Sequence, residues 1–145
     1  MTKYLAIDHG TKRLGIAISD DSKKYAFYRD TLLVDNKLLQ KISIIVAEEN
    51  IEKIIIGYPT SLQSEKTLQT LEVEKFTDSL RSFLFNKGLK PELVFHDERL
   101  TSRLALSNIL ESGLNKKNRR DKSNIDSEAA RIILSDYLDS ENRKL

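Results

Sequence analysis

The first twenty residues constrain the fold most, because they contain two apolar runs joined by a short turn that includes Gly10. Apolar residues alternate along the first run as they do in a half-buried strand, so the pattern predicts a strand, a turn and a second strand. Asp8 shares one face of the first strand with Tyr4 and Ala6, where a core residue is expected. A carboxylate on such a face is costly without a compensating cation, which makes Asp8 the leading candidate for a functional residue.

Asp8 also has a purely structural interpretation. Its carboxylate can end the strand in an Asx turn, accepting a hydrogen bond from the following backbone, with Gly10 supplying a positive φ. The two interpretations differ in whether other acidic residues gather around Asp8.

The rest of the chain changes its hydrophobic period several times. A third alternating run at residues 25–32 predicts an antiparallel meander with the first two strands. Helices are expected at about 36–50, 73–88, 101–113 and 125–139, and further strands at 53–57 and 92–98. This order predicts the α/β class, with one mixed five-stranded sheet in which three antiparallel strands are continued by two parallel strands, and with helices on both faces.

Composition limits the classes of protein that the chain can belong to. Its 145 residues suit one domain, which we place at residues 1–139, followed by a polar tail at 140–145. The absence of cysteine excludes disulfides, thiolate zinc sites and a cysteine nucleophile. No apolar run is long enough to span a bilayer and no signal-peptide pattern is present, which predicts a cytoplasmic protein. With a net charge of only +2, any surface that binds nucleic acid must be local.

Three acidic positions are expected at one edge of the predicted sheet. Asp8 and Glu98 follow strands, and ligands of such sheets bind beyond the carboxyl ends of the parallel strands. Asp126 stands on a helical stripe with Ala130 and Ile133, so it should face the sheet. Clustered carboxylates need a divalent cation, and their oxygens suit Mg²⁺ or Mn²⁺. Two such ions about 3.5–4 Å apart would support hydrolysis of a phosphodiester.

Each of the later acids has an alternative interpretation. Successive strand residues face opposite ways, so only one of Asp97 and Glu98 can point into the pocket, while the other can pair with an arginine at the following helix. Ser123 and Asp126 resemble a capping pair, in which the helix dipole alone would stabilise the acid by about 0.3–1 kcal/mol. The two histidines flank the acids, and we do not assign them to the predicted site.

Two groups of basic residues are predicted to contact nucleic acid. Lys12 and Arg13 follow Asp8 in the turn, where they can reach a phosphate oxygen beside the metal ions. The densest positive run precedes Asp126 and comprises Lys116, Lys117, Arg119, Arg120 and Lys122. Both groups can instead be solvated loop residues. Because no aromatic residue is interleaved with the second run, we expect salt-dependent phosphate contacts there and no base stacking.

Four motifs resemble those of the YqgF family, whose members are described as Holliday junction resolvases and as pre-16S rRNA nucleases of the ribonuclease H-like fold. The motifs are Asp8-x-Gly10-x-Lys12-Arg13-x-Gly15-x-Ala17-x-Ser19-Asp20, Gly57-Tyr58-Pro59, Asp97-Glu98-Arg99-Leu100-Thr101-Ser102 and Asp126-x-x-Ala129-Ala130-x-x-Ile133-Leu134. The resemblance covers nearly the whole chain. It breaks at residues 60–67, which replace a more glycine-rich loop of the family.

The resemblance implies that Asp8, Glu98 and Asp126 are metal-binding catalytic acids, with Asp97 as the weaker candidate. It also implies an endonuclease that matures the 5′ end of pre-16S rRNA, with branched DNA as the alternative substrate. Two other functions fit parts of the sequence. One is an ATP-binding protein of the actin and sugar-kinase type, since the turn after Asp8 resembles its first phosphate loop, although that group needs two domains. The other is a non-catalytic RNA-binding module.

Overall fold

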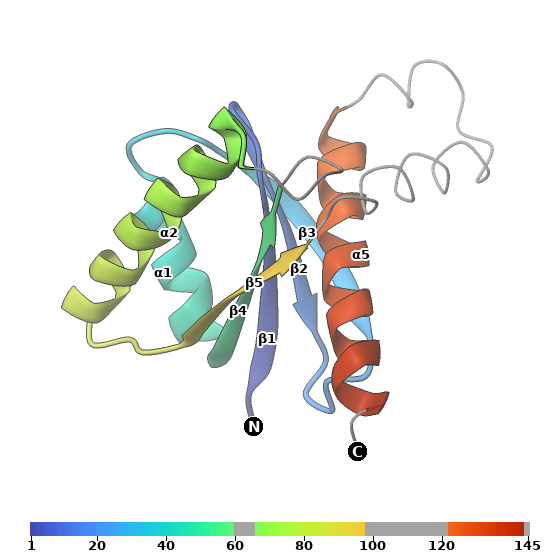
Figure 1. Cartoon of the computed structure of the whole chain (residues 1–145). Helices are drawn as coiled ribbons and strands as arrows, with labels where there is room; N and C mark the ends of the chain where they lie inside the picture. Colours follow the sequence, from blue (N-terminus) through green and yellow to red (C-terminus); the bar gives the residue numbers. More distant parts are fainter. Residues whose placement is uncertain (60–65, 98–121, 144–145) are drawn as a thin grey trace.

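The computed structural model describes residues 1–59, 66–97 and 122–143, with side chains at 128–142 in the last range. The elements in chain order are β1 (Lys3–His9), β2 (Arg13–Ser19), β3 (Ala26–Leu33), α1 (Leu38–Glu48), β4 (Ile51–Tyr58), α2 (Leu68–Asn86), β5 (Glu92–Asp97) and α5 (Lys122–Arg143) (Figure 1). The helix expected at 101–113 lies outside the described residues. No helix in the described ranges combines the length and apolar character needed to cross a bilayer.

The strands form the predicted mixed sheet, in the order β3-β2-β1-β4-β5. Strands β1, β2 and β3 pair antiparallel, whereas β1 pairs parallel with β4 and β4 pairs parallel with β5. Helices α1 and α2 cover one face of the sheet and α5 covers the other (Figure 1). The expected five-stranded architecture is therefore confirmed.

Alternation along the central strands divides the core between the two faces. One face of the sheet packs against α1 and α2 through large aliphatic side chains. The strands contribute Leu5, Ile7, Ile16, Ile54 and Ile56, and the helices contribute Ile42, Val46, Val73 and Leu80. Ala6, Ala17 and Ile55 pack with α5, where Ala130, Ile133 and Leu134 meet them. Strand β4 places isoleucines on both faces, which is why its sequence is continuously apolar.

Helix α5 is longer than the hydrophobic pattern predicts, because it begins at Lys122 and ends at Arg143. Most of the expected polar tail at 140–145 is consequently helical, as far as Arg143. The helix continues past its apolar residues because polar contacts with the sheet hold its last turns.

Lys53 of β4 makes these contacts. Its ammonium donates a hydrogen bond to the hydroxyl of Tyr137 at 2.8 Å and lies 3.4 Å from the carboxylate of Glu141. Burial opposes the charge of the ammonium, but the hydrogen bond to Tyr137 and the nearby negative groups raise the pKa of Lys53 above its usual value. The C-terminal part of α5 is thus fixed beside the N-terminal ends of β1 and β4.

The turn between β1 and β2 requires glycine for a reason other than the expected one. Gly10 does not have a positive φ; among the described glycines only Gly88 does. The amide of Gly10 instead donates to the carbonyl of Arg13 at 3.0 Å, and a Cβ at position 10 would lie 2.5 Å from that oxygen. Glycine is therefore required here because the backbone of Arg13 approaches closely, and not because residue 10 has a positive φ.

Replacement Gly10→Ala should lower the free energy of unfolding by about 1–3 kcal/mol, because the added methyl forces the turn to shift. Urea denaturation followed by circular dichroism would measure the change. The exposed neighbour offers a matched control, Thr11→Ala, which we expect to stay within about 0.5 kcal/mol of the wild type. Equal stability of Gly10→Ala and the wild type would contradict the assigned role of this glycine.

Asp20 organises the turn between β2 and β3. Its carboxylate accepts hydrogen bonds from the backbone amides of Lys24 and Tyr25 at 2.9 and 3.0 Å, and from the hydroxyl of Ser22. These hydrogen bonds lower the pKa of Asp20 to about 2. The bond from Ser22 contributes most, followed by the bond from the amide of Tyr25. The turn that leads into β3 is therefore held by an ionised carboxylate.

The stabilisation from Asp20 should be complete above its ordinary pKa of 3.8 and disappear as the pH falls through about 2. The sign follows from the unfolded chain, which binds this proton at higher pH than the folded chain does. We expect the difference in unfolding free energy between wild type and Asp20→Asn to be largest above pH 4. Carboxyl NMR titration would check the midpoint directly, and a midpoint near 4 would argue against these hydrogen bonds.

Candidate active site

Asp8 lies near the carboxyl end of β1, on the face of the sheet that α5 covers. It is half-buried, and it follows Tyr4 and Ala6, which are both buried against α5. Gly15 of β2 is its partner across the antiparallel ladder, and the parallel register brings Gly57 of β4 to its other side. The positions directly beside Asp8 on both neighbouring strands are therefore glycines.

Helix α5 brings Asp126 to the same end of the sheet. The helix runs antiparallel to β1, with the end of α5 beside the start of β1 (Figure 1), and there the rings of Tyr4 and Tyr137 lie 6.0 Å apart. From Tyr137 back to Asp126 the helix covers about 16 Å at 1.5 Å per residue. From Tyr4 forward to Asp8 the strand covers about 13 Å. The backbone at Asp126 thus lies near the level of Asp8.

The position of Asp126 within α5 weakens its structural interpretation. The first turn of α5 contains no acidic residue, because the helix already begins at Lys122. Asp126 precedes Ala130 and Ile133 by one and two helical turns, and both of those residues are fully buried against the sheet. A helix cap or a terminal dipole therefore does not account for an acid at this position. The side chain of Asp126 lies outside the described residues.

The alternation of side chains along strand β5 places Asp97 on one face of the sheet. Leu93 packs on the α1 and α2 side, and the ring of Phe95 lies 4.6 Å from that of Tyr58. Val94 instead packs on the α5 side. By this alternation Asp97 belongs to the α1 and α2 face, opposite to Asp8. Glu98 lies outside the described residues.

The two histidines also fall on different faces. His9 packs its ring 4.8 Å from that of Phe76 in α2, and burial lowers its pKa although Glu72 opposes the shift. His96 lies on the α5 face, where its Nε2 is 2.8 Å from the Asp136 carboxylate. This contact joins β5, which ends just before Glu98, to α5, which contains Asp126. Sequence reasoning missed it, because it links residues 40 positions apart.

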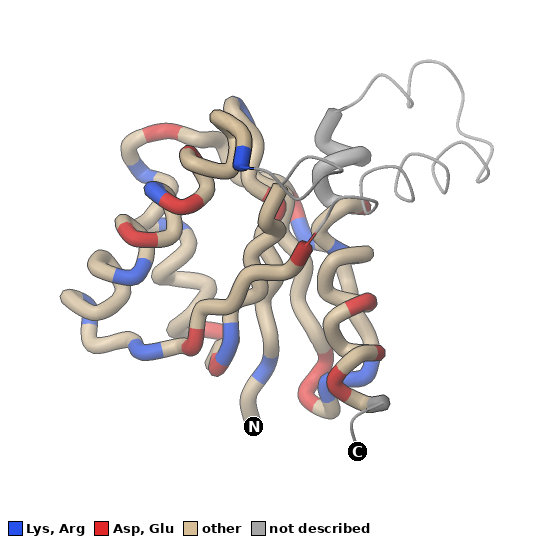
Figure 2. Tube along the Cα trace, in the orientation of Figure 1, with Lys and Arg blue, Asp and Glu red and all other residues tan. Residues whose placement is uncertain are grey.

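The predicted basic residues are only partly described. Lys12 is exposed in the turn after Asp8, and its carbonyl accepts a hydrogen bond from the amide of Val34 at 2.9 Å. Arg13 is half-buried and is the first residue of β2, not part of the turn. Lys122 is the first residue of α5, so its backbone is helical and not part of a loop. The remaining four, Lys116, Lys117, Arg119 and Arg120, lie outside the described residues. Elsewhere Lys and Arg are interspersed with Asp and Glu (Figure 2).

Within the part of the chain that is described, no three His, Cys, Asp or Glu side chains gather in a way that could hold a metal ion. Of the three predicted acids, only Asp8 has a described side chain, so the metal site stays a prediction. The donor chemistry is suitable, since carboxylate oxygens are the ligands that a hard divalent cation prefers.

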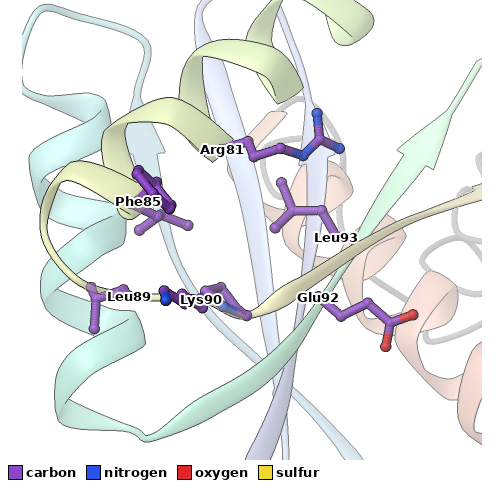
Figure 3. A pocket seen from close by; sticks show the side chains of 8 residues that line it. Arg81, Phe85, Leu89, Lys90, Glu92 and Leu93 are labelled. Atoms are coloured by element: carbon purple, nitrogen blue, oxygen red, sulfur yellow. The ribbon is translucent and has the colours of Figure 1, made fainter.

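An open pocket of about 290 Å³ lies elsewhere, between the C-terminal end of α2 and the start of β5 (Figure 3). The pocket is largely apolar, lined by Leu84, Phe85, Leu89 and Leu93. Charged side chains lie at its rim, from Arg81, Lys90 and Glu92. The start of β5 is at the opposite end of the sheet from Asp8. The pocket therefore does not belong to the candidate active site.

Comparison with known proteins gives consistent results over nearly the full length. A family model described as "RuvX: Holliday junction resolvase" matches residues 2–140. A protein of Amoebophilus asiaticus is 34% identical over 144 residues, which are 99% of this chain and 98% of that protein. One of Bacteroides thetaiotaomicron is 40% identical over 142 residues, which are 97% of this chain and 98% of that protein. Both bear the name "Putative pre-16S rRNA nuclease".

Solved structures show the same fold. RuvC of T. thermophilus in complex with a Holliday junction substrate gives a TM-score of 0.56 at 12% identity, covering 98% of this chain and 96% of that one. The fowlpox virus Holliday junction resolvase gives a TM-score of 0.57 at 12% identity, covering 96% and 99%. These likenesses confirm the ribonuclease H-like fold.

The contact between His96 and Asp136 should contribute about 0.5–1 kcal/mol to stability, a modest value because Asp136 is largely exposed. A double-mutant cycle of His96→Ala and Asp136→Ala, measured by urea denaturation, isolates this coupling. The control cycle pairs His96→Ala with Asp139→Ala, an exposed acid nearby in α5. Coupling below about 0.2 kcal/mol in the first cycle would show that the pair does not fasten β5 to α5.

Proposed function

Because this chain belongs to the RuvX (YqgF) family, we propose that it is a metal-dependent endonuclease that processes the 5′ end of pre-16S rRNA in the cytoplasm. The observation that carries this proposal is the position of Asp8. It lies at the carboxyl end of a central strand, between two glycines, at the level that the backbone of Asp126 reaches in α5. The full-length identity with relatives named as nucleases supports the reaction type.

We assign Asp8, Glu98 and Asp126 as the acids that hold one or two Mg²⁺ or Mn²⁺ ions. Glu98 is chosen over Asp97 because the alternation of β5 leaves Asp97 on the opposite face from Asp8. When bound, such ions activate water and stabilise the leaving oxygen of the phosphodiester. The chain's own contribution is to hold the carboxylates in place, since β1 fixes Asp8 and the packing of α5 fixes Asp126.

The basic residues supply the contacts with nucleic acid in this proposal. Lys12 and Arg13 are placed directly after Asp8, where they would bind phosphates that flank the cleaved bond. The run of Lys116, Lys117, Arg119, Arg120 and Lys122 would hold the phosphate backbone of a structured RNA from the side of α5. Binding through these groups is electrostatic and should weaken steeply with salt.

A second candidate substrate is branched DNA. The family description names Holliday junction resolvases, and solved proteins of the same fold act on Holliday junctions according to their descriptions. DNA and RNA present the same phosphates to a site built from carboxylates and metal ions. Resolution of a four-way junction needs two cleavages, so this function would require a second copy of the chain.

Substitution of a metal-binding acid should abolish cleavage in this scheme. With Mn²⁺ present, we expect Asp8→Asn and Glu98→Gln to lose more than the roughly 10- to 100-fold that changes outside the ligand shell cause. The matched control is Asp97→Asn, which removes an adjacent acid from the opposite face and should keep most of the activity. Gel assays on a precursor rRNA and on a four-way DNA junction, each with and without EDTA, would measure these losses.

The same assay separates the candidate functions. Faster cleavage of the junction than of the RNA would make DNA the preferred substrate. Cleavage that survives in Asp8→Asn or in EDTA would contradict the metal-dependent mechanism. If Asp97→Asn lost cleavage activity while Glu98→Gln kept it, Asp97 and not Glu98 would be the second metal-binding acid. Tight RNA binding that is unchanged when all three acids are neutralised, with no cleavage, would indicate a non-catalytic module.

A further inference from the structure

The pocket between the end of α2 and the start of β5 suits one side chain of a partner better than a whole small molecule. Its volume is about 290 Å³, and its mouth is open to solvent. Sites for small molecules enclose most of their ligand, and their volumes begin at about 300 Å³. An open pocket at this lower limit fits a single apolar side chain, which is the kind of anchor found at the centre of protein interfaces.

The lining of the pocket is apolar, and part of it is exposed. Leu84 is buried, whereas Leu89 and Leu93 are half-buried. The ring of Phe85, at the edge of the pocket, is 66% exposed. A side chain inserted here would cover this ring, and aromatic rings are prominent among the residues that dominate binding energy at interfaces.

Strand alternation directs the acidic lining residue away from the pocket. Glu92 precedes Leu93, so its side chain belongs to the α5 face, where its carboxylate lies 3.8 Å from the ammonium of Lys53. Figure 3 shows this carboxylate pointing away from Phe85 and Leu89. The negative charge of Glu92 therefore lies outside the pocket, where Lys53 balances it.

Two cations remain beside the pocket. The ammonium of Lys90 lies 5.8 Å from the centre of the Phe85 ring, and Lys90 has no ion pair among the described residues. Arg81 pairs with Asp78 at 3.1 Å, but both side chains are largely exposed, and such surface pairs contribute little. Because opposite charges complement each other across interfaces, the pocket favours a partner with acidic residues.

Strand β5 offers a regular edge beside the pocket. It is the outer strand in the order β3-β2-β1-β4-β5, and each of its six residues is at least partly exposed. Its pairing with β4 runs from Glu92 to Asp97 without a register shift, whereas the ladder between β2 and β3 contains one. Residues 93–96 include neither Pro nor Lys, which commonly protect sheet edges. In the described part of the chain, β5 is thus the sheet edge better suited to accept another strand.

The pocket and this edge share one face of the sheet. Leu93, which lines the pocket, packs on the α1 and α2 face, and alternation places Phe95 on the same face. The two residues are about 7 Å apart along the strand. Phe95 is 46% exposed and lies beside the ring of Tyr58, with 4.6 Å between the ring centres. A strand added beside β5 would therefore present alternate side chains to the pocket and then to Phe95.

We propose that the pocket and the outer edge of β5 bind an extended acidic segment of a partner protein. The segment would add a strand beside β5 through backbone hydrogen bonds and insert one large apolar side chain between Phe85 and Leu93. In this mode of recognition the backbone supplies affinity, and pockets for alternate side chains supply specificity. Acidic residues next to the apolar anchor would face Lys90 and Arg81. The inference is independent of the proposed nuclease function.

Single-stranded RNA and a second copy of the chain are the competing occupants. Unpaired bases are held by stacking on successive rings, whereas Phe85 alone is aromatic among the described residues that line the pocket. The pocket also lies at the end of the sheet opposite to Asp8. A closed dimer uses the same patch on both copies, so it would bring Lys90 and Arg81 of one copy against the same cations of the other. A separate acidic partner avoids both difficulties.

Selection from a phage-displayed library of random peptides of about 12 residues tests the proposal without assuming a sequence. The target is the full chain, immobilised on beads. We expect the enriched peptides to share large apolar residues at alternate positions, with Asp or Glu beside them. The most enriched peptide, labelled with fluorescein, then gives a Kd by fluorescence anisotropy.

Phe85→Ala should weaken the binding of this peptide at least about fivefold, the loss expected for an anchor contact. The matched control is Tyr25→Ala, which removes a ring with the same exposure, 66%, from the turn before β3. It should leave the Kd within about twofold of the wild type. Lys90→Glu should weaken binding roughly twofold to fivefold, and it should strengthen the binding of a peptide with Lys in place of the acidic residues.

Hydrogen–deuterium exchange checks whether a strand is added. With the peptide bound, amides of β5 that point outward should exchange more slowly, because they gain hydrogen-bond partners. Amides of β3, at the other edge of the sheet, should exchange at unchanged rates. Unchanged exchange throughout β5 would overturn the proposal even if the peptide bound in the pocket.

Failure to enrich related peptides would overturn the inference, as would equal affinity of wild type and a folded Phe85→Ala variant. Anisotropy with a labelled single-stranded RNA and sedimentation velocity of the chain alone address the competing occupants. RNA binding that Phe85→Ala weakens and Tyr25→Ala does not would assign the pocket to RNA, and a dimer that Phe85→Ala dissociates would assign it to a second copy. Either result would also overturn the proposal. None of these measurements depends on cleavage, so a failure of the nuclease proposal leaves them unaffected.

Discussion

Helix α5 reaches the end of β1 that carries Asp8 because the sheet beneath it is lined with small side chains. Ala6 and Ala17 on the sheet and Ala130 on the helix are fully buried, so the two backbones approach closely over the central strands. Ile133 and Leu134 fill the space on either side of this contact. Any shift of the helix along the sheet would move Asp126 relative to Asp8, so the geometry of the site is a consequence of this packing.

The second layer of the structure has a different role. Helices α1 and α2 cover the larger aliphatic core, and their surfaces mix charges of both signs (Figure 2). His9 and Asp97 belong to that face although they stand next to the proposed catalytic residues Asp8 and Glu98 in the sequence. Alternation along β-strands places neighbouring residues on opposite faces, so adjacency in the chain is a poor guide to a shared site.

Most of the fold could be predicted from hydrophobic period alone. The alternation along β1 and the continuous run in β4 gave the correct faces and the correct sheet, because each strand has a strong local pattern. The ends of α5 were wrong by several residues, since Lys53 and Glu141 stabilise its last turns through a tertiary contact that no local pattern records. The reason for Gly10 was also wrong, because a close approach to Arg13 depends on the path of the turn.

The candidate site was less accessible to such reasoning. The face of Asp8 followed from its own strand, whereas the choice between Asp97 and Glu98 depended on which residues of β5 pack against α1 and α2 and which pack against α5. Asp8 and Asp126 stand near opposite ends of the sequence, so the two proposed acids come to the same end of the sheet only when α5 packs against it. During synthesis on the ribosome a nascent chain holds Asp8 long before α5 has left the exit tunnel, and in the proposed scheme the enzyme gains its activity only when translation is nearly complete.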